Sequence, residues 1–275
     1  MELPTASREL RTAIELARTA GVEVVRLRRG ELGVEMKPGD EPVTVADRRA
    51  SEMIVGGLRA AFPADPIISE ELPTAADALA ARRVWLVDPI DGTKDFIRGG
   101  DGFAVMIGLV EDGVPVLGVV HQPTIDRTFY ATAAGGAFVW TAADGTRPLA
   151  VSAVATAAEV RLVASASHRS DSIDRVKTTL GIANEHNIGS VGIKLCLIAL
   201  GERDLYVSPA TKTKAWDTAG PQAILAAAGG RLTDLDGKLL DYRGELAHRR
   251  GLVASNGHVH AEVIAKLAPL FRKLD

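Results

Sequence analysis

The sequence has few of the residues that build disulfide frameworks, aromatic platforms or charged surfaces. Its 275 residues include a single cysteine, Cys196, which excludes an internal disulfide and a cysteine-based zinc cluster. Aromatic residues make up 4 %, which disfavours platforms that stack bases or sugars. Lys and Arg number 32 against 35 Asp and Glu, and the resulting net charge of −3 argues against polymeric nucleic acid or a membrane surface as partner.

Long apolar runs are also missing. No stretch approaches the roughly 18 apolar residues needed to span a bilayer. Residues 1–11 lack the apolar region of a secretory signal. We therefore expect a cytoplasmic protein without a membrane partner, and a single cysteine fits that reducing compartment.

Glycine and charged residues are plentiful. The chain has 27 glycines, and charged residues make up 24 % of it. Any chemistry must therefore come from charged side chains and from backbone groups placed by glycine.

Hydrophobic spacing predicts helices and strands in a definite order. Apolar residues at helical spacing predict helices near residues 10–27 and 47–62. Consecutive strand-like runs over residues 103–140, separated by turn residues, predict an antiparallel meander. Later segments alternate between strand and helix, with one helix expected to begin at Pro221. This order predicts an α/β (α+β) layered sandwich.

The change in pattern suggests two parts. Asp144-Gly145 reads as the start of a linker, because both residues favour turns. We therefore expect an N-terminal α+β part over residues 1–145 and a C-terminal α/β part over residues 146–275.

The stretch that begins at Asp88 is the richest in chemistry. A predicted strand ends at Asp88, Pro89 stiffens the turn, Asp91 follows, and Gly92-Thr93 opens a predicted helix. Two carboxylates on one turn repel unless a cation lies between them, and Mg²⁺ prefers such oxygen ligands. Backbone N–H groups at a helix start can bind phosphate. The alternative is an Asp-Pro turn followed by a capping aspartate.

A related phosphatase chemistry is excluded by one residue. In the aspartyl-phosphatase signature Asp-x-Asp-Gly-Thr, the nucleophilic aspartate lies two residues before the second one. Pro89 occupies that position here and carries no nucleophile. A metal-bound water is therefore the better candidate nucleophile.

Three further carboxylates lie at predicted element boundaries. Glu70 follows a short strand, and Asp47 and Asp217 each precede or begin a predicted helix. Each has an ordinary structural explanation, a loop acid for Glu70 and a helix cap for the other two. Rigid element ends are nevertheless what a metal site requires.

Four short motifs give the sequence a family resemblance. In their order and spacing they resemble the inositol monophosphatase superfamily, and the match covers nearly the whole chain. The motifs are Val43-Thr44-x-Ala46-Asp47, Ile68-Ser69-Glu70-Glu71, Trp85-x-x-Asp88-Pro89-Ile90-Asp91-Gly92-Thr93 and Trp216-Asp217-x-Ala219-Gly220.

The resemblance implies a fold and a metal site. The fold is a layered αβαβα sandwich of the inositol monophosphatase and fructose-1,6-bisphosphatase type, and the site takes two or three Mg²⁺ ions. Glu70, Asp88 and the Ile90 carbonyl would bind the first ion. Asp88, Asp91 and Asp217 would bind the second, and Glu70 would also reach a weaker third.

The resemblance also implies catalytic roles. Thr93, hydrogen-bonded with Asp47, would orient and deprotonate the water on the first metal. The Gly92 and Thr93 N–H groups would hold the phosphate, while the second metal stabilises the leaving oxygen. Family members are typically inhibited by lithium. The resemblance is compatible with a homodimer, although the sequence itself gives no oligomeric state.

Features near two lysines resemble the 3′(2′),5′-bisphosphate nucleotidase (CysQ-type) branch. Lys94-Asp95-Phe96 is similar to the Lys-Glu-Phe of that branch, and Gly189-Ser190-Val191-Gly192-Ile193-Lys194 is similar to a second segment of it. The resemblance implies that Lys94, Ser190 and Lys194 face the substrate, with a lysine at a second phosphate. His168 falls in a loop resembling one that contacts nucleotide.

The alternative is that Lys94 and Lys194 are ordinary surface residues. Two departures also leave specificity open, because Asp95 replaces the usual Glu and the segment before Lys194 carries an extra glycine.

The first hypothesis is therefore a Mg²⁺-dependent phosphatase that removes the 3′-phosphate of adenosine 3′,5′-bisphosphate, and of 3′-phosphoadenylyl sulfate. The second keeps the chemistry but takes inositol 1-phosphate or fructose 1,6-bisphosphate. The third is a non-catalytic phosphate-binding module, against which the complete carboxylate set argues. In each case the partner is a small phosphate ester.

Overall fold

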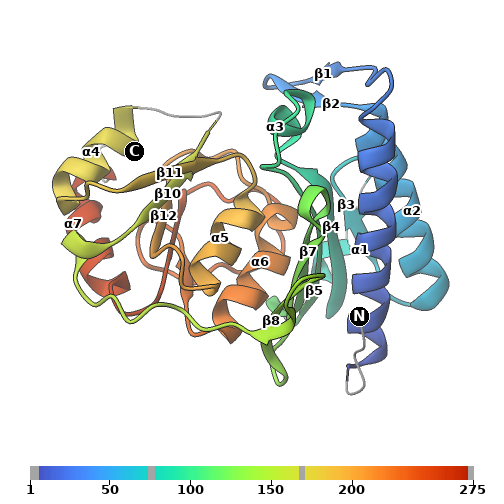
Figure 1. Ribbon diagram of the computed structural model, residues 1–275. Helices are drawn as coiled ribbons and strands as arrows, with labels where there is room; N and C mark the ends of the chain where they lie inside the picture. The colour runs from blue at the N-terminus through green and yellow to red at the C-terminus, as the bar shows by residue number, and fades with distance from the viewer. Residues whose placement is uncertain (1–5, 74–77, 167–170, 272–275) are drawn as a thin grey trace.

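The computed structural model describes residues 6–73, 78–166 and 171–271 as five layers, helix, sheet, helix, sheet, helix (Figure 1). The outer helices α1 (Arg8–Leu27) and α2 (Val45–Ala61) cover one face of a seven-stranded sheet. Helices α5 (Val191–Ala199) and α6 (Ala215–Ala227) fill the middle. The predicted αβαβα sandwich is confirmed.

The seven-stranded sheet carries the meander predicted from residues 103–140. Its order is β3-β4-β5-β6-β7-β8-β9, and all neighbours are antiparallel except β3 and β4. The strands are β3 (Ile67–Ser69), β4 (Arg83–Asp91), β5 (Ala104–Glu111), β6 (Val114–Gln122), β7 (Arg127–Thr132), β8 (Gly136–Thr141) and β9 (Gly145–Pro148).

The five-stranded sheet belongs to the second half of the chain. Its order is β11-β10-β12-β14-β13, and α4 (Asp171–Leu180) and α7 (His260–Phe271) form the last layer beside it (Figure 1). The strands are β10 (Leu162–Ser165), β11 (Glu185–Ile188), β12 (Leu205–Ser208), β13 (Arg231–Thr233) and β14 (Leu252–Ser255).

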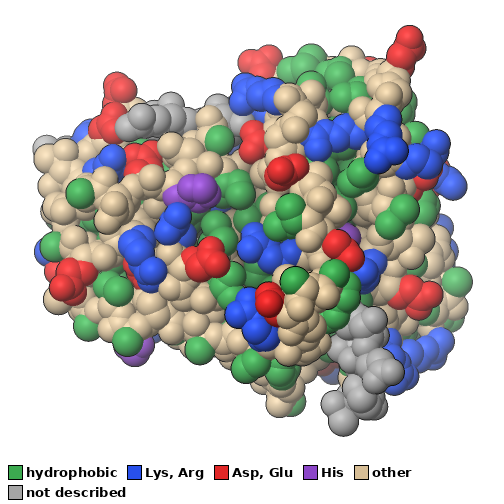
Figure 2. All heavy atoms as spheres, viewed as in Figure 1, with side chains coloured by type: hydrophobic (Ala, Val, Ile, Leu, Met, Phe, Trp, Pro, Cys, Tyr) green, Lys and Arg blue, Asp and Glu red, His purple; other side chains and the backbone are tan. Residues whose placement is uncertain are grey.

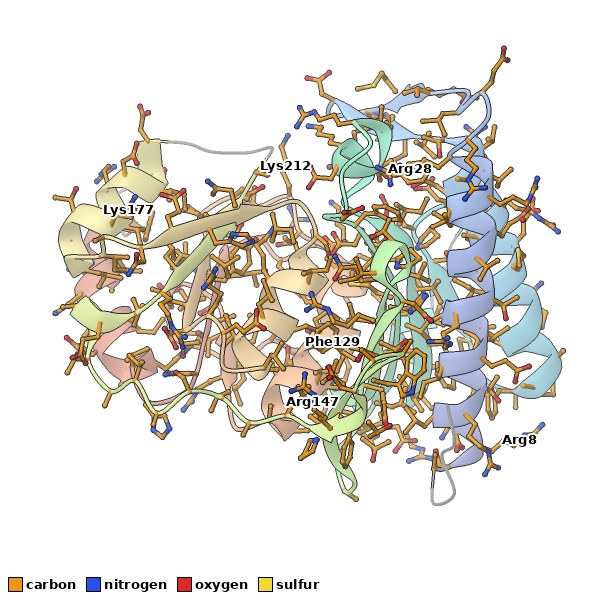
Figure 3. All side chains as sticks on the ribbon, viewed as in Figure 1. Arg8, Arg28, Phe129, Arg147, Lys177 and Lys212 are labelled. Carbon is orange, nitrogen blue, oxygen red and sulfur yellow. The ribbon has the colours of Figure 1, made fainter. Side chains whose placement is uncertain are left out.

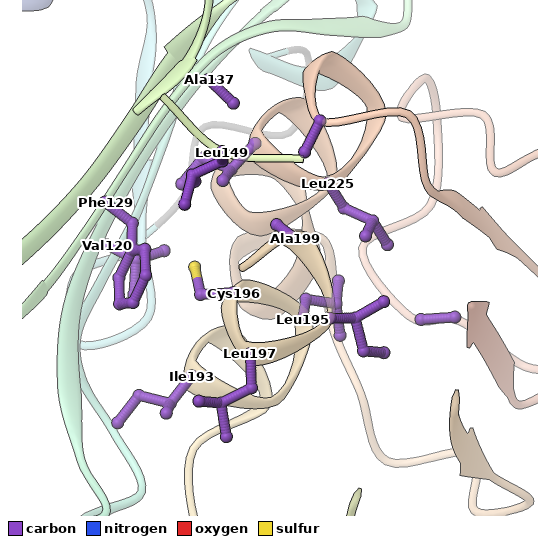
Figure 4. Close-up of a cluster of buried hydrophobic side chains, with 14 of the residues drawn as sticks. Val120, Phe129, Ala137, Leu149, Ile193, Leu195, Cys196, Leu197, Ala199 and Leu225 are labelled. Atoms are coloured by element: carbon purple, nitrogen blue, oxygen red, sulfur yellow. The ribbon is translucent and has the colours of Figure 1, made fainter. Parts of the chain in front are cut away.

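The middle helices are apolar on almost every side because both sheets cover them. All but one of the α5 residues are buried, as expected for a helix enclosed by other elements. Cys196 lies in this core beside Phe129 and Val120 of the first sheet (Figure 4). The same hydrophobic cluster draws residues from both sides of position 145, and the division into two parts stays a prediction.

Two short elements were not expected from the sequence. A hairpin of β1 (Glu35–Lys37) and β2 (Glu41–Val43) stands at one end of α2. The predicted linker at Asp144-Gly145 is wrong, because these residues form the turn between β8 and β9, and Gly145 has a φ of 68°. Residues 142–144 form the three-residue loop of this hairpin, and such loops favour a glycine in the left-handed region at their end.

One helix boundary also differs from the expectation. Helix α6 begins at Ala215 and contains Pro221, which we expected to open the helix. Helix α3 (Thr93–Ile97) is a single short turn of five residues. Within the described residues, three 3₁₀ turns complete the elements, at Ala78–Ala80, Pro123–Ile125 and Ala157–Glu159.

The face of the molecule shown in Figure 2 has no dominant charge. In Figure 2 acidic and basic side chains are mixed over the face that it displays. Among the described helices, none combines the length and apolar character needed to cross a membrane.

Candidate active site

Strand β4 ends in the carboxylate turn singled out in the sequence. The pairing of β4 with β5 is irregular between Asp88 and Asp91, so the turn leaves the regular ladder there. Asp88 Oδ1 accepts a hydrogen bond from the Ile90 N–H at 3.0 Å, which fixes one oxygen of the carboxylate. Asp88 and Asp91 are both buried.

Three carboxylates meet at this turn. Oxygens of Glu70, Asp88 and Asp217 lie within 4.8 Å of one another. Burial raises the pKa of Glu70 to about 7 and, with repulsion from the neighbouring carboxylates, holds the pKa values of Asp88 and Asp217 well above their usual range. Such a group ionises fully only when a cation compensates it. The all-oxygen donor set therefore fits a hard divalent cation.

Asp91 lies beside this group and is held by the middle layer. Its Oδ2 accepts hydrogen bonds from Ser190 Oγ at 2.5 Å and from the Gly192 N–H at 2.7 Å. Ser190 is also the N-cap of α5, because its Oγ accepts from the Ile193 N–H at 3.0 Å. Asp91 Oδ2 is thus held by two donors of the middle layer.

Thr93 lies between the carboxylate turn and the helical outer layer. Its hydroxyl is 3.0 Å from the Ile90 carbonyl and 3.3 Å from Asp47 Oδ1. Gly92 precedes it with a φ of 95°, and a Cβ at that position would lie 2.6 Å from the Gly102 carbonyl oxygen. Only glycine fits this turn without a clash.

Asp47 and Asp217 occupy equivalent positions in two helices. Neither is the cap itself. Each is the third residue of its helix and accepts a hydrogen bond from the N–H of the residue before the helix, Thr44 at 2.8 Å and Lys214 at 2.7 Å. One oxygen of each carboxylate is thereby fixed, and burial raises the pKa of Asp47 to about 6.

Lys37 supplies a cation that the sequence analysis did not assign to the site. From the β1–β2 hairpin, its Nζ lies 2.6 Å from Glu70 Oε1 and 2.7 Å from Glu71 Oε1. The two carboxylates hold the pKa of Lys37 above its usual range against the effect of burial. The signal that could have revealed it is the turn at residues 38–40, which folds the chain back just before α2.

A cavity of about 770 Å³ opens beside the carboxylates. Its far side is formed by apolar and hydroxyl side chains from α4, β12 and the following loop, including Ile173, Tyr206 and Ser208. Lys212 lies across the opening from the β1–β2 hairpin, with its Nζ 3.5 Å from the Gly39 carbonyl (Figure 3). The cavity is large enough for a ligand of drug-like or nucleotide size.

Most of the predicted site residues line this cavity. Those that do are Glu70, Asp88, Ile90, Asp91, Gly92, Thr93, Lys94, Lys194 and Asp217. Asp47 lies behind Thr93, and Ser190 lies behind Asp91. His168 lies outside the described residues.

The two predicted substrate lysines differ in environment. Lys94, on α3, is half-buried. Lys194 is fully buried, so it is not an ordinary surface lysine. Its Nζ donates to the carbonyls of Ile188 at 3.0 Å and Gly189 at 2.6 Å, and burial lowers its pKa to about 8.

Comparisons with known proteins agree on the family. The model of the inositol monophosphatase family matches residues 6–270. The chain is 40 % identical over 236 residues to the 3′(2′),5′-bisphosphate nucleotidase CysQ of Salmonella typhimurium, covering 84 % of this chain and 92 % of the relative.

Two further similarities extend over almost the whole chain. A histidinol-phosphatase of Mycobacterium tuberculosis is 35 % identical over 266 residues, covering 94 % of this chain and 97 % of the relative. Among solved structures, the Thermotoga maritima IMPase has a TM-score of 0.84 and 28 % identity, covering 98 % of this chain and all (100 %) of that chain.

Proposed function

Since the chain belongs to the inositol monophosphatase family and is a phosphatase acting on phosphoric monoesters, we propose that it removes the 3′-phosphate of adenosine 3′,5′-bisphosphate in a Mg²⁺-dependent reaction. The proposal extends to 3′-phosphoadenylyl sulfate. The observation that carries it is the carboxylate group at one end of a roomy cavity that also contains Lys94 and Lys194. A substrate with a second anionic group benefits from such added cations.

The carboxylates and one carbonyl would hold two or three Mg²⁺ ions. Glu70, Asp88 and the Ile90 carbonyl serve the first ion, Asp88, Asp91 and Asp217 the second, and Glu70 a weaker third. When bound, the ions supply charge neutralisation, activation of a water molecule and stabilisation of the leaving oxygen.

The chain's own residues position the phosphate and move a proton. The Gly92 and Thr93 N–H groups hold the phosphate at the start of α3. The Thr93 hydroxyl, 3.3 Å from Asp47 Oδ1, orients the attacking water and relays its proton to Asp47. A pKa of Asp47 raised by burial to about 6 suits a group that must accept a proton near neutral pH.

The far end of the cavity selects the rest of the substrate. Lys94 and the third N–H of Lys194, the one not donated to the Ile188 and Gly189 carbonyls, would serve the second phosphate, with Ser190 as a further contact. A nucleotide contact by His168 stays a prediction from the sequence. We place the reaction in the cytoplasm, with lithium as an inhibitor and a homodimer as the assembly to test.

A phosphate-release panel tests the proposal. It compares adenosine 3′,5′-bisphosphate, inositol 1-phosphate, fructose 1,6-bisphosphate and histidinol phosphate, each with Mg²⁺ and with chelator. We expect the nucleotide to be hydrolysed fastest and the chelator to stop all release. Undiminished release in chelator would overturn the metal assignment, and faster release from another ester would overturn the substrate.

Histidinol phosphate is the second candidate substrate. It is favoured by the 35 % identity to a histidinol-phosphatase over 94 % of this chain. The variant Lys94→Ala separates it from the nucleotide, because loss of a second-phosphate contact raises KM several-fold for a bisphosphate and leaves a monophosphate unaffected.

A further inference from the structure

Lys194 is a charged residue in an unusual place. Its side chain is fully buried at the start of α5, and its Nζ lies 5.2 Å from the centre of the Tyr206 ring. Lysine is seldom buried completely unless its charge is compensated. Here the carbonyls of Ile188 and Gly189 accept two of its three N–H donors.

The segment held by Lys194 is the one that holds Asp91. Residues 188–192 run from the two carbonyls to the two groups that donate to Asp91 Oδ2, Ser190 Oγ and the Gly192 N–H. Two other contacts fix the same segment, the Ser190 N–H to the Gly102 carbonyl at 2.8 Å and the Gly189 N–H to Asp95 Oδ2 at 3.0 Å. The ammonium is therefore part of a clamp on the metal-site carboxylate.

We propose that Lys194 is a positioning residue for the metal site, acting through the 188–192 segment on Asp91. By fixing the segment it keeps Asp91 Oδ2 on Ser190 and Gly192, which leaves the other oxygen to face the cation. The inference rests on the proposed function insofar as Asp91 is a metal ligand. It differs from the substrate role of Lys194, because the clamp acts before any substrate is present.

The charge of Lys194 supports the same role. Asp91, Asp95 and Asp217 are the carboxylates that face its ammonium. Two of its N–H donors are on backbone carbonyls. Lys194 therefore offsets the repulsion among these three carboxylates without occupying a carboxylate oxygen. Lys37 does the opposite at Glu70, where its ammonium contacts a carboxylate oxygen directly.

The test measures Mg²⁺ binding without substrate, by calorimetry on the full-length protein. For Lys194→Met we expect affinity to fall about tenfold or more, as is typical when an outer contact of a metal ligand is lost. Asp91→Asn serves as the reference for loss of the ligand. Lys212→Met removes a positive charge from the same cavity and is expected to leave Mg²⁺ affinity unchanged.

A kinetic readout separates positioning from substrate binding. With inositol 1-phosphate, which has a single phosphate, Lys194→Met should raise the Mg²⁺ concentration needed for half-maximal turnover and recover at saturating Mg²⁺. Wild-type Mg²⁺ affinity together with wild-type turnover of this monophosphate would overturn the inference and leave only a second-phosphate role.

Two milder variants test the same inference if Lys194→Met does not fold. Lys194→Gln keeps a donor to the carbonyls and should lose less Mg²⁺ affinity than the methionine variant. Ser190→Ala removes one donor to Asp91 and should weaken Mg²⁺ binding in the same direction.

Because both residues act on the same carboxylate, combining Ser190→Ala with Lys194→Gln should give a less than additive loss. Strict additivity would contradict the clamp. If Asp91→Asn leaves Mg²⁺ binding intact, the ligand assignment fails instead, and failure of the nucleotide as substrate affects neither measurement.

Discussion

A prediction about the close packing of α6 follows from three glycines. Gly108 and Gly118 pair across β5 and β6, and Gly220 of α6 packs directly on them. A Cβ at Gly118 would lie 1.9 Å from the Gly220 carbonyl oxygen. Ordinary contact begins near 3.4 Å, so Gly118→Ala requires α6 to move away by the difference, about 1.5 Å.

The displacement should reach the metal site. Asp217 lies three residues before Gly220 on the same helix, whereas Asp88 is fixed on the sheet. Moving the helix separates these two carboxylates. A misplacement of about 1 Å can lower turnover by about 100-fold, and overpacking costs about 1–3 kcal/mol of stability.

The assays are thermal unfolding and a Mg²⁺ titration of phosphate release. For Gly118→Ala we expect the melting temperature to fall by about 3–10 °C and the half-saturating Mg²⁺ concentration to rise about tenfold. The matched control is Gly56→Ala, at an exposed helical glycine with nothing within 4 Å. The free energy of unfolding of this control variant should rise by up to about 1 kcal/mol. If Gly118→Ala kept the wild-type Mg²⁺ dependence, the packing argument would be refuted.

Three other expectations can be checked on purified variants. Thr93→Val should lower kcat by about 100-fold or more with little change in stability, and Thr93→Ser should restore it. Asp204→Ala removes a fully buried carboxylate that accepts four hydrogen bonds. Denaturant unfolding should show that this variant loses about 2–4 kcal/mol of stability. The control Asp241→Ala, at an exposed carboxylate, should lose less than about 1 kcal/mol. Burial lowers the pKa of His121 to about 4, so protonation favours unfolding, and stability that is complete above pH ~6.5 declines as the pH falls toward 4. The free energy of unfolding should differ between pH 7 and pH 5 by about 2 kcal/mol less in His121→Gln than in the wild type. An unchanged pH dependence would contradict this.

The layers and the carboxylate set were accessible from the sequence because both depend on local patterns. Alternating apolar runs predict the meander, and the Asp88–Thr93 stretch places its ligands within six consecutive residues. Glu70, Asp88 and Asp217 come from distant parts of the chain, and only the family resemblance joined them before the structure did.

The features that could not be predicted from the sequence depend on tertiary packing. The boundary of α6 was misjudged because proline usually starts a helix, whereas burial between two sheets keeps Pro221 inside one. For Lys194 the sequence predicts a substrate contact, with a surface lysine as the alternative, because nothing local signals that its ammonium folds back onto carbonyls. The three-residue strands β1 and β2 are too short for a periodic pattern.

The helical layer between the two sheets has a consequence for the order of folding. Asp88 and Asp91 come from the first sheet, but the partners that complete their surroundings, Ser190 and Asp217, arrive on α5 and α6 from more than 90 positions later in the chain. Such non-local contacts form late because a long loop must close first. On refolding, secondary structure should therefore return before Mg²⁺-dependent phosphate release, and the delay between the two would time the docking of the middle layer.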